Sequence, residues 1–384
     1  MKKDLGLYIH IPFCIKKCAY CDFLSWSGDK DQKEEYVRDL EQEIRSYKTF
    51  AADYQVSTVY FGGGTPSILE TGQIERIMGA LRQTFRIEKK AEITLEMNPG
   101  TARKEKLKAY RQLGINRLSI GIQSVKNENL KLLGRIHTYE DFLESYHMAR
   151  EAGFDNISGD LISSLPGQTL EEWKEELEIL IRTPLEHLSV YQLIIEEGTE
   201  FYERYGEHEE LLPDEETSRE IYLWTGEYLE NQGFRQYEIS NYARAGKESR
   251  HNLRYWERKD YLGLGLGAAA MIRNMRMSNT RDWEKYRTGC RDPRKIREEV
   301  EFLEEPRQIE EFMFLGLRKT RGVSRKEFRR TFGKDLDLIY EKTLKKYLEN
   351  GMLQESGDRI FLSEEGILLS NQIFADFQIG RAHV

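Results

Sequence analysis

The first half of the chain alternates between short apolar runs and longer amphipathic stretches, and this pattern limits the fold more than any other feature. The apolar runs, which are typical of buried strands, are Leu7–Ile11, Thr58–Phe61, Ile93–Glu96, Arg117–Ile122, Asn156–Ile162 and His187–Leu193. The stretches with helical periodicity between them are Gln32–Thr49, Gln73–Phe85, Lys104–Leu113, Tyr139–Ala152 and Leu170–Arg182. Repeats of this kind predict a parallel sheet with right-handed crossovers. Because roughly 190 residues are few for a closed eight-stranded barrel, we expect an α/β fold built on an open, partial (β/α)6 barrel.

The C-terminal third has a different pattern, in which helices surround a single hairpin. Helical periodicity occurs at Arg307–Arg318, Ser324–Thr331, Leu336–Asn350 and Glu364–Asp376. Between the last two, the dipeptide Gly357-Asp358 separates two short apolar runs and predicts a tight turn. The order predicts an α+β winged-helix-like module. We therefore expect a barrel core at 1–200, an extension at 201–290 and the winged-helix-like module at 291–378, with the polar stretch from about 270 to 300 as a linker and covering segment.

Charge and hydropathy narrow the class of protein. The 58 basic and 66 acidic residues leave a net charge of −8, which does not favour a nucleic-acid partner. The C-terminal module is not distinctly basic either, so a lid or partner-docking role suits it better than DNA binding. No apolar run approaches the length of a membrane span. The first apolar run contains His10 and Pro12 and lacks a small-residue cleavage site, so we expect a strand rather than a signal peptide, and a cytoplasmic protein.

Three of the four cysteines lie close together, as Cys14-x3-Cys18-x2-Cys21. A disulfide framework is unexpected in a large chain without a secretory signal. A structural zinc site usually needs four ligands in two separated pairs, whereas Cys290 is distant and has no Cys or His beside it. Three thiolates would instead cover three irons of a cubane and leave the fourth iron open to a ligand. The spacing alone leaves a cluster, a zinc site and a redox pair as alternatives, and Cys290 is expected to be an ordinary thiol.

Polar and glycine residues follow the predicted strands at their carboxyl ends, where parallel sheets carry their chemistry. The cysteines follow the first strand, and a glycine-rich segment, Gly62-Gly63-Gly64-Thr65-Pro66, follows the second. Glu96, Gln123 and Asp160 stand at or near the ends of the third, fourth and fifth. A glycine run lets a backbone approach a ligand closely, although a tight turn alone would also explain it. Together these residues predict one site at this edge of the sheet.

These motifs resemble the radical S-adenosylmethionine (SAM) superfamily and, within it, the oxygen-independent coproporphyrinogen III oxidase family. The likeness runs from about Gly6 to about Phe377 and includes Tyr8-Ile9-His10-Ile11-Pro12-Phe13-Cys14, Glu96-Met97-Asn98-Pro99, Gly121-Ile122-Gln123-Ser124, Leu133-Gly134-Arg135-Ile136-His137 and Leu165-Pro166-Gly167-Gln168-Thr169. The resemblance implies a radical-SAM partial barrel that holds a [4Fe–4S] cluster on Cys14, Cys18 and Cys21. It also implies S-adenosyl-L-methionine contacts at Tyr8, Tyr20, Gly63, Gly64, Thr65, Glu96, Gln123, Arg135 and Asp160.

Two details distinguish branches of that family. The oxidases resemble Cys-x3-Cys-x2-Cys-x-Cys, whereas this chain has Phe23 at the position of the fourth cysteine. Downstream, His251-Asn252-x-x-Tyr255-Trp256 is similar to the heme chaperone branch. Histidine is a common axial ligand of heme, so His251 is a candidate heme ligand, although a lone histidine is more often a hydrogen-bonded structural residue. The segment Gly263-x-Gly265-x-x-Ala268 fits a dinucleotide fingerprint only superficially, because we expect no buried strand before it.

Three functions remain open from the sequence. The first is a heme chaperone that carries a SAM-bound cluster, binds heme and transfers it to an acceptor hemoprotein, with an electron donor such as flavodoxin or ferredoxin and with possible peripheral membrane association through the acceptor. The second is a radical SAM oxidase of the coproporphyrinogen dehydrogenase type, so whether the chain is an enzyme is left open. The third is a structural zinc or cluster protein. Phe23 and the His251 motif favour the first function over the second, and the set of residues expected to contact SAM argues against the third.

Two segments depart from the family pattern. In the family that this chain resembles, the fifth strand ends in the pattern Asp-Leu-x-Tyr-Gly-Leu-Pro. This chain has Asp160-Leu161-Ile162-Ser163-Ser164-Leu165-Pro166 instead, so we expect the ligand side of the fifth strand to differ. The last six residues, 379–384, do not continue the amphipathic pattern before them. We expect this tail to be non-native, and it takes no part in the fold prediction.

Overall fold

Six parallel strands, in the order in which they occur along the chain, form the centre of the molecule. The computed structural model describes residues 2–378, and within them one twelve-stranded sheet has the order β12-β11-β10-β9-β1-β2-β3-β4-β5-β6-β8-β7. The parallel centre consists of β1 (Lys3–Ile11), β2 (Tyr54–Gly63), β3 (Ile87–Met97), β4 (Arg117–Gln123), β5 (Ile157–Ser163) and β6 (His187–Gln192). The predicted α/β fold with a partial (β/α)6 barrel is confirmed.

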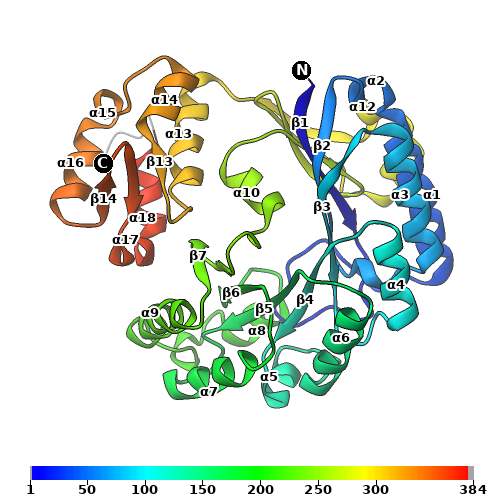
Figure 1. Cartoon of the computed structure of the whole chain (residues 1–384), viewed down its shortest axis with the longest axis horizontal. Coiled ribbons are helices and arrows are strands. Elements are labelled where there is room, and N and C mark those ends of the chain that lie inside the picture. Colours follow the sequence, from blue (N-terminus) through cyan, green and yellow to red (C-terminus); the bar gives the residue numbers. More distant parts are fainter. Residues whose placement is uncertain (1, 379–384) are drawn as a thin grey trace.

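The crossover helices cover the outer face of this curved sheet, whereas its inner face looks toward the C-terminal module (Figure 1). They are α1 (Lys30–Ser46), α3 (Thr71–Thr84), α4 (Lys104–Gln112), α6 (Tyr139–Glu151) and α7 (Leu170–Leu180), with the shorter α2 (Lys48–Ala51), η1 (Pro66–Ile68) and α5 (Asn127–Leu132) in the connections. Capping boxes begin α1, α6 and α7, at Asp29, Thr138 and Thr169, where a side-chain oxygen accepts from a free backbone N–H of the first turn. The sheet and these helices enclose one large hydrophobic core.

The stretch predicted to be a linker and covering segment extends the sheet instead. It follows β9 (Tyr261–Leu264), which pairs in parallel with β1, and forms β10 (Ala269–Ile272), β11 (Met275–Asn279), α11 (Trp283–Gly289), α12 (Pro293–Ile296) and β12 (Arg297–Phe302). Arg273 and Asn274 both have positive φ, of 50° and 62°, which is the backbone of a two-residue hairpin turn. The prediction was wrong because polar residues on a half-exposed antiparallel edge hide the alternation. β9 is also the buried strand thought to be missing before Gly265, but a strand follows it rather than a helix.

The other edge of the sheet carries the extension. There β8 (Asn241–Ala243) and β7 (Arg235–Glu238) continue antiparallel beyond β6, after α8 (Glu200–Tyr205), η2 (Glu209–Leu211) and α9 (Glu215–Asn231). α10 (Arg250–Trp256), which contains His251, lies on the inner side of the sheet, between it and the C-terminal module (Figure 1). The motif that distinguishes the branches is therefore inside the molecule.

The C-terminal module has its own core and a three-stranded sheet in the order β13-β15-β14, as the winged-helix-like prediction requires. Its elements are α13 (Glu305–Gly316), β13 (Val323–Ser324), α14 (Arg325–Phe332), α15 (Leu336–Ile339), α16 (Glu341–Glu349), β14 (Leu353–Ser356), β15 (Arg359–Leu362), α17 (Glu364–Leu368) and α18 (Ser370–Asp376). The core of this module is separate from the core of the main sheet and begins at Ile309, after β12, the last strand of that sheet. Two backbone hydrogen bonds join the module to β7 and its turn, from Ile239 to Arg318 (3.1 Å) and from Thr320 to Tyr237 (3.2 Å).

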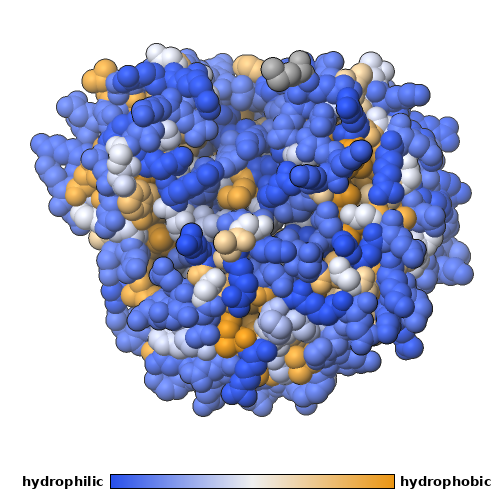
Figure 2. Space-filling view, in the orientation of Figure 1, coloured by the Kyte–Doolittle hydropathy of each residue, from blue (hydrophilic) through white to orange (hydrophobic). Residues whose placement is uncertain are grey.

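The surface seen in Figure 2 is largely hydrophilic, and its hydrophobic side chains form small separate groups. In the described part of the chain, every helix is too short or too polar to cross a membrane. The expected non-native tail, residues 379–384, lies outside the described residues.

Candidate functional site

A cavity of about 1030 Å³ lies on the inner side of the partial barrel. It begins at the loop after β1, crosses the strand ends and reaches α17 and α18 of the C-terminal module. All three clustered cysteines line it, and so do eight of the nine residues expected to contact SAM: Tyr20, Gly63, Gly64, Thr65, Glu96, Gln123, Arg135 and Asp160. The ninth, Tyr8, does not line the cavity, and its hydroxyl lies 3.1 Å from Nδ1 of His10. Residues that are far apart in the sequence thus share one wall.

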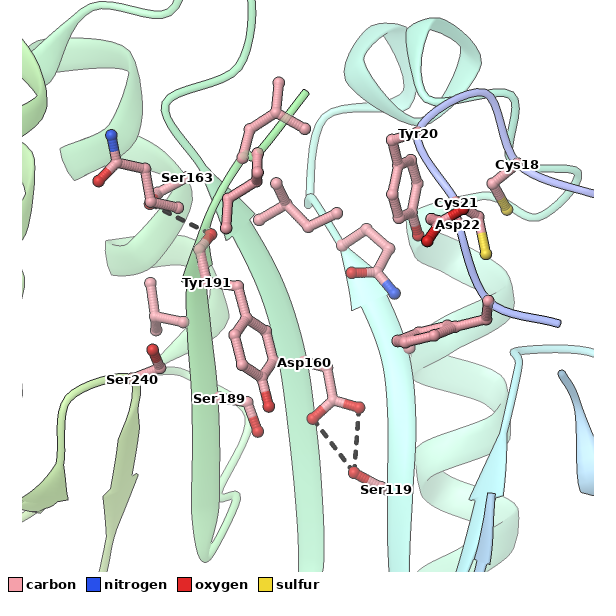
Figure 3. A pocket seen from close by; sticks show the side chains of 18 of the residues that line it. Cys18, Tyr20, Cys21, Asp22, Ser119, Asp160, Ser163, Ser189, Tyr191 and Ser240 are labelled. Atoms are coloured by element: carbon pink, nitrogen blue, oxygen red, sulfur yellow. Dashed lines mark hydrogen bonds between the residues drawn. The ribbon is translucent and has the colours of Figure 1, made fainter. Parts of the chain in front are cut away.

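The cysteine loop presents three partly exposed free thiols to the cavity, as Figure 3 shows for Cys18 and Cys21 beside Tyr20. Arg135 donates to Sγ of Cys18 over 3.5 Å, and Sγ of Cys14 lies 3.5 Å from Oγ1 of Thr65. The guanidinium of Arg135 therefore places a positive charge beside a sulfur that could bind iron. Among residues 2–378, no three acidic, histidine or cysteine side chains converge on one metal ion.

The glycine segment after β2 brings two strand ends into close contact. A Cβ at Gly64 would stand 2.6 Å from the carbonyl oxygen of Phe13, and Gly63 has a φ of 111° with the ring of His10 against it. A side chain at either position would therefore push the loop away from β1. Since the cysteine loop starts directly after Phe13, the glycines hold exposed backbone beside it.

Two carboxylates stand on the inner face, and each is already hydrogen-bonded. Glu96 accepts from the hydroxyl of Tyr60 (2.7 Å) and the backbone N–H of Gly63 (3.2 Å). Burial raises the pKa of Glu96 to about 7, although those hydrogen bonds oppose the shift. Asp160 accepts from Ser119 at both oxygens (3.1 and 3.0 Å) and from Ser158 (3.2 Å), and burial raises its pKa as well. Both can accept hydrogen bonds from the hydroxyl or ammonium groups of a ligand.

Gln123, at the end of β4, and Arg135, beside Cys18, line the end of the cavity that contains the cysteine loop. Gln123 has a φ of 69° at a register shift in the pairing of β4 with β5, and such strain in a non-glycine residue often marks a functional position. Arg135 donates to Oδ1 of Asn98 (2.6 Å) and to the carbonyl of Gly121 (2.8 Å). Asn98 also donates to Thr65 (2.9 Å), so it links the glycine segment to Arg135. Sequence reasoning missed Asn98, although its spacing of two from Glu96 placed both side chains on one face of the chain.

His251 lies outside the cavity lining and is fully buried. Its Nδ1 is 2.9 Å from Oγ1 of Thr58, and its Nε2 is 2.8 Å from the hydroxyl of Tyr255. Burial and the nearby cation of Arg254 lower the pKa of His251 to about 3, so the ring is neutral. With both nitrogens engaged, His251 could ligate heme only after these hydrogen bonds break, and the arrangement matches the alternative of a hydrogen-bonded structural histidine.

The cavity is also lined by residues of β4 and β6 that sequence reasoning did not select, among them Arg117, Ser189 and Tyr191. In Figure 3 the Tyr191 ring extends along the wall toward Asp160, with Ser189 and Ser240 on the same side. Arg117 begins β4, Ser189 is in the middle of β6 and Tyr191 is the last residue but one of β6, and none of them belongs to a recognised motif. The one available signal was alternation, since Arg117, Ser119, Gly121 and Gln123 all face the same side of β4.

Phe23, at the position of the fourth cysteine of the oxidases, lines the cavity mouth with a side chain that is 69% exposed. Ile194, from the segment after β6, also lines the cavity and is 67% exposed. Large apolar side chains at such exposure are a favourable surface for an apolar ligand or partner.

Comparisons with known proteins agree with this geometry. Residues 8–180 match the family model of the radical SAM superfamily, and residues 303–369 match that of the HemN C-terminal domain. The curated "Heme chaperone HemW" of Bacillus subtilis is 38% identical over 96% of this chain and 98% of its own length. The Escherichia coli protein of the same name is 34% identical over 97% and 98%.

Among solved structures, the radical SAM enzyme coproporphyrinogen III oxidase (HemN) of Escherichia coli is similar over 98% of this chain and 91% of its own. Its TM-score is 0.85 at 25% sequence identity. The radical SAM superfamily implies a [4Fe–4S] cluster and SAM, which the cysteine loop and the strand-end residues of this cavity suit. By its fold, by this site and by near-complete coverage at up to 38% identity, the chain belongs to the HemW family of radical SAM proteins.

Proposed function

We propose that this protein is a heme chaperone that binds heme in a SAM- and cluster-containing state and transfers it to an acceptor hemoprotein. The observation that carries the proposal is similarity to proteins named heme chaperones along nearly the whole chain, at 38% identity for the Bacillus subtilis protein. Phe23 supports it further, because the pattern that the oxidases resemble has a fourth cysteine at this position. An apolar side chain there suits a large flat ligand better than another thiol.

The residues of the cavity suggest how a cofactor would be held. In the superfamily, the cluster supplies an electron for reductive cleavage of SAM. Cys14, Cys18 and Cys21 would bind three irons, and Arg135 would offset the thiolate charge beside Cys18. The backbone at Gly63 and Gly64, with Thr65, would line the amino group of SAM. Glu96, Gln123 and Asp160 would orient its hydroxyl groups, and Tyr20 would pack beside the cluster.

The proposed partners follow from the same reading. Heme or a related porphyrin would occupy the part of the cavity that SAM leaves free, below Phe23 and Ile194. An acceptor hemoprotein would take the heme, and a flavodoxin- or ferredoxin-type donor would reduce the cluster. If the acceptor is membrane-bound, contact with it would bring this protein to a membrane surface, and otherwise we propose that it works in the cytoplasm.

An anaerobic turnover assay separates this function from the oxidase alternative. Reconstituted, reduced protein receives SAM and coproporphyrinogen III, and formation of protoporphyrinogen is followed. We expect no product at catalytic yield, whereas the same protein should bind heme in a spectrophotometric titration. Catalytic product would make the protein an oxidase, and failure to bind heme would remove the chaperone proposal.

Phe23→Ser tests the proposed place of the heme. Loss of about half the contact area of a phenylalanine costs about 1 kcal/mol of binding, so the heme Kd should rise roughly 5-fold. Leu338→Ser is the matched control, because Leu338 is 78% exposed in the C-terminal module and does not line the cavity. Equal titrations of wild type and Phe23→Ser would place the heme elsewhere.

A further inference from the structure

The cavity floor contains a charged side chain without a hydrogen-bond partner. Arg117 begins β4, is only 2% exposed and lines the cavity. Its Nε is buried and unpaired, and among residues 2–378 no hydrogen bond or ion pair to its guanidinium is found. A buried guanidinium with spare donors is costly, because water no longer satisfies the N–H groups. Such a group in a cavity wall is available to a ligand.

The nearby acidic side chains do not fill this role. Glu96 and Asp160 feel the positive charge of Arg117, which opposes the rise in the pKa of each. Both, however, direct their oxygens to other donors, Glu96 to Tyr60 and Gly63, and Asp160 to Ser119 and Ser158. Long-range attraction therefore offsets part of the charge of Arg117 and leaves its N–H groups unused.

The position of Arg117 along β4 sets it apart from the cluster end of the cavity. Arg117, Ser119, Gly121 and Gln123 alternate with core residues and all line the cavity. Six residues of strand separate Arg117 from Gln123 by roughly 20 Å. Ser189 pairs with Asp160, which in turn pairs with Gly121, so Ser189 lies beside Asp160 in the sheet. Ser189, Tyr191 and Ser240 also line the cavity, on the side opposite the cysteine loop (Figure 3). Arg117 thus lies at the N-terminal end of β4, away from the cysteine loop, and Glu96 and Asp160 lie between it and Gln123 along the strands. Arg318, whose Nε is also buried and unpaired, lines the same cavity.

We propose that Arg117 receives a carboxylate of the ligand that occupies the lower cavity, so that bound heme would place a propionate at the floor. This inference rests on the proposed function and adds the orientation of the ligand to it. A guanidinium binds a carboxylate through two parallel hydrogen bonds, which also define the angle of the bound group. The apolar body of the ligand then lies toward Phe23 and Ile194, so the cavity matches an amphiphilic ligand at both ends.

Titration with heme and with its dimethyl ester tests the inference, because the ester keeps the ring and removes both carboxylates. A hydrogen bond to a charged group contributes about 1.5–3 kcal/mol, so wild-type protein should bind heme roughly 10- to 150-fold more tightly than the ester. Arg117→Gln should bind heme about as weakly as wild type binds the ester, and its ester affinity should be unchanged. Arg117→Lys, which keeps the charge, should recover part of the preference for heme.

Each outcome decides between the two proposals. Wild-type protein that binds both ligands equally well overturns the carboxylate site but leaves heme binding standing. Wild-type protein that binds neither ligand overturns the proposed function itself. If Arg117→Gln weakens heme and ester by the same factor, Arg117 only supports the fold and the inference fails. Should that variant not fold, the wild-type comparison and Arg117→Lys still decide the question.

Discussion

The imidazole of His251 stacks on the phenol ring of Tyr60, with the ring centroids 5.2 Å apart and the planes 27° from parallel. Tyr60 in turn donates a hydrogen bond to Glu96 (2.7 Å), one of the carboxylates of the cavity. The motif on α10 therefore packs against Tyr60 and, through it, supports Glu96, one of the residues expected to contact SAM. We therefore expect His251 to position Tyr60 and Glu96 without touching a ligand itself.

Replacement of His251 by alanine should lower stability and cluster-site order together. The variant loses a ring stack and leaves Thr58 and Tyr255 without their shared partner, which costs about 2–4 kcal/mol of the free energy of unfolding. Chemical denaturation at pH 8 measures this loss. His208→Ala, at an exposed histidine, is the control and should change stability by less than about 0.5 kcal/mol.

The loss caused by His251→Ala should also depend on pH. The pKa of His251 is about 3 in the folded protein, below the 6.5 of an unperturbed histidine. The unfolded state therefore takes up a proton as pH falls below 6.5, while the folded state does not until pH 3, so the stabilisation by His251 is full above 6.5 and declines below it. At pH 5.5 the difference between wild type and variant should be about 1.4 kcal/mol smaller than at pH 8. A difference independent of pH would contradict a neutral, buried His251.

The same variant tests heme ligation. If His251 is not an axial ligand, heme bound to His251→Ala keeps the visible spectrum of the wild-type complex. A shifted spectrum at unchanged affinity would instead show that the buried ring turns outward to bind iron.

Cys18→Ala should abolish the broad absorbance near roughly 400 nm that an iron–sulfur cluster gives after anaerobic reconstitution. Cys290→Ala is the matched control, because Cys290 is a buried thiol at the end of α11 whose pKa burial raises to about 11. It should keep the absorbance and the iron content of wild type. An unchanged spectrum in Cys18→Ala would refute the cluster assignment.

Ser164→Gly should stabilise the protein. Ser164 has a φ of 57°, and its hydroxyl is buried without a hydrogen-bond partner. The family pattern has glycine at this position. Glycine relieves the strain and removes the unpaired group, so the free energy of unfolding should rise by about 1 kcal/mol. Ser163→Gly makes the same change one residue earlier, where φ is not positive, and should instead destabilise. The two melting temperatures, measured side by side, check the prediction.

Gly64→Ala should weaken SAM binding, because its Cβ would meet the carbonyl of Phe13 at 2.6 Å and displace the loop that begins the cysteine motif. Gly79→Ala is the control. Gly79 lies inside α3 with nothing within 4 Å of its Cβ position, so alanine there should stabilise the helix by about 0.5–1 kcal/mol. Equilibrium dialysis of SAM against both reconstituted variants measures the effect, and equal affinities would refute it.

Much of the site was predictable because parallel strands bring their carboxyl ends to one edge. Once the alternation of strands and helices was recognised, Cys14, Gly63, Glu96, Gln123 and Asp160 had to share that edge, and eight of the nine expected SAM contacts line one cavity. Their roles as ligands stay predictions. Tyr8 stands on the first strand too, but its hydroxyl turns to His10 instead.

The sequence by itself determined the parallel order of the sheet, the place of the cysteine loop and the helix–hairpin pattern of the C-terminal module, because each follows from periodicity or from residues close in the chain. Only the tertiary structure decided that 270–302 extends the sheet, that His251 is enclosed between Thr58 and Tyr255, and that Arg117 reaches a cavity floor without a partner. Pairing at a sheet edge and the burial of a polar side chain depend on neighbours from distant parts of the chain, and no local pattern encodes them.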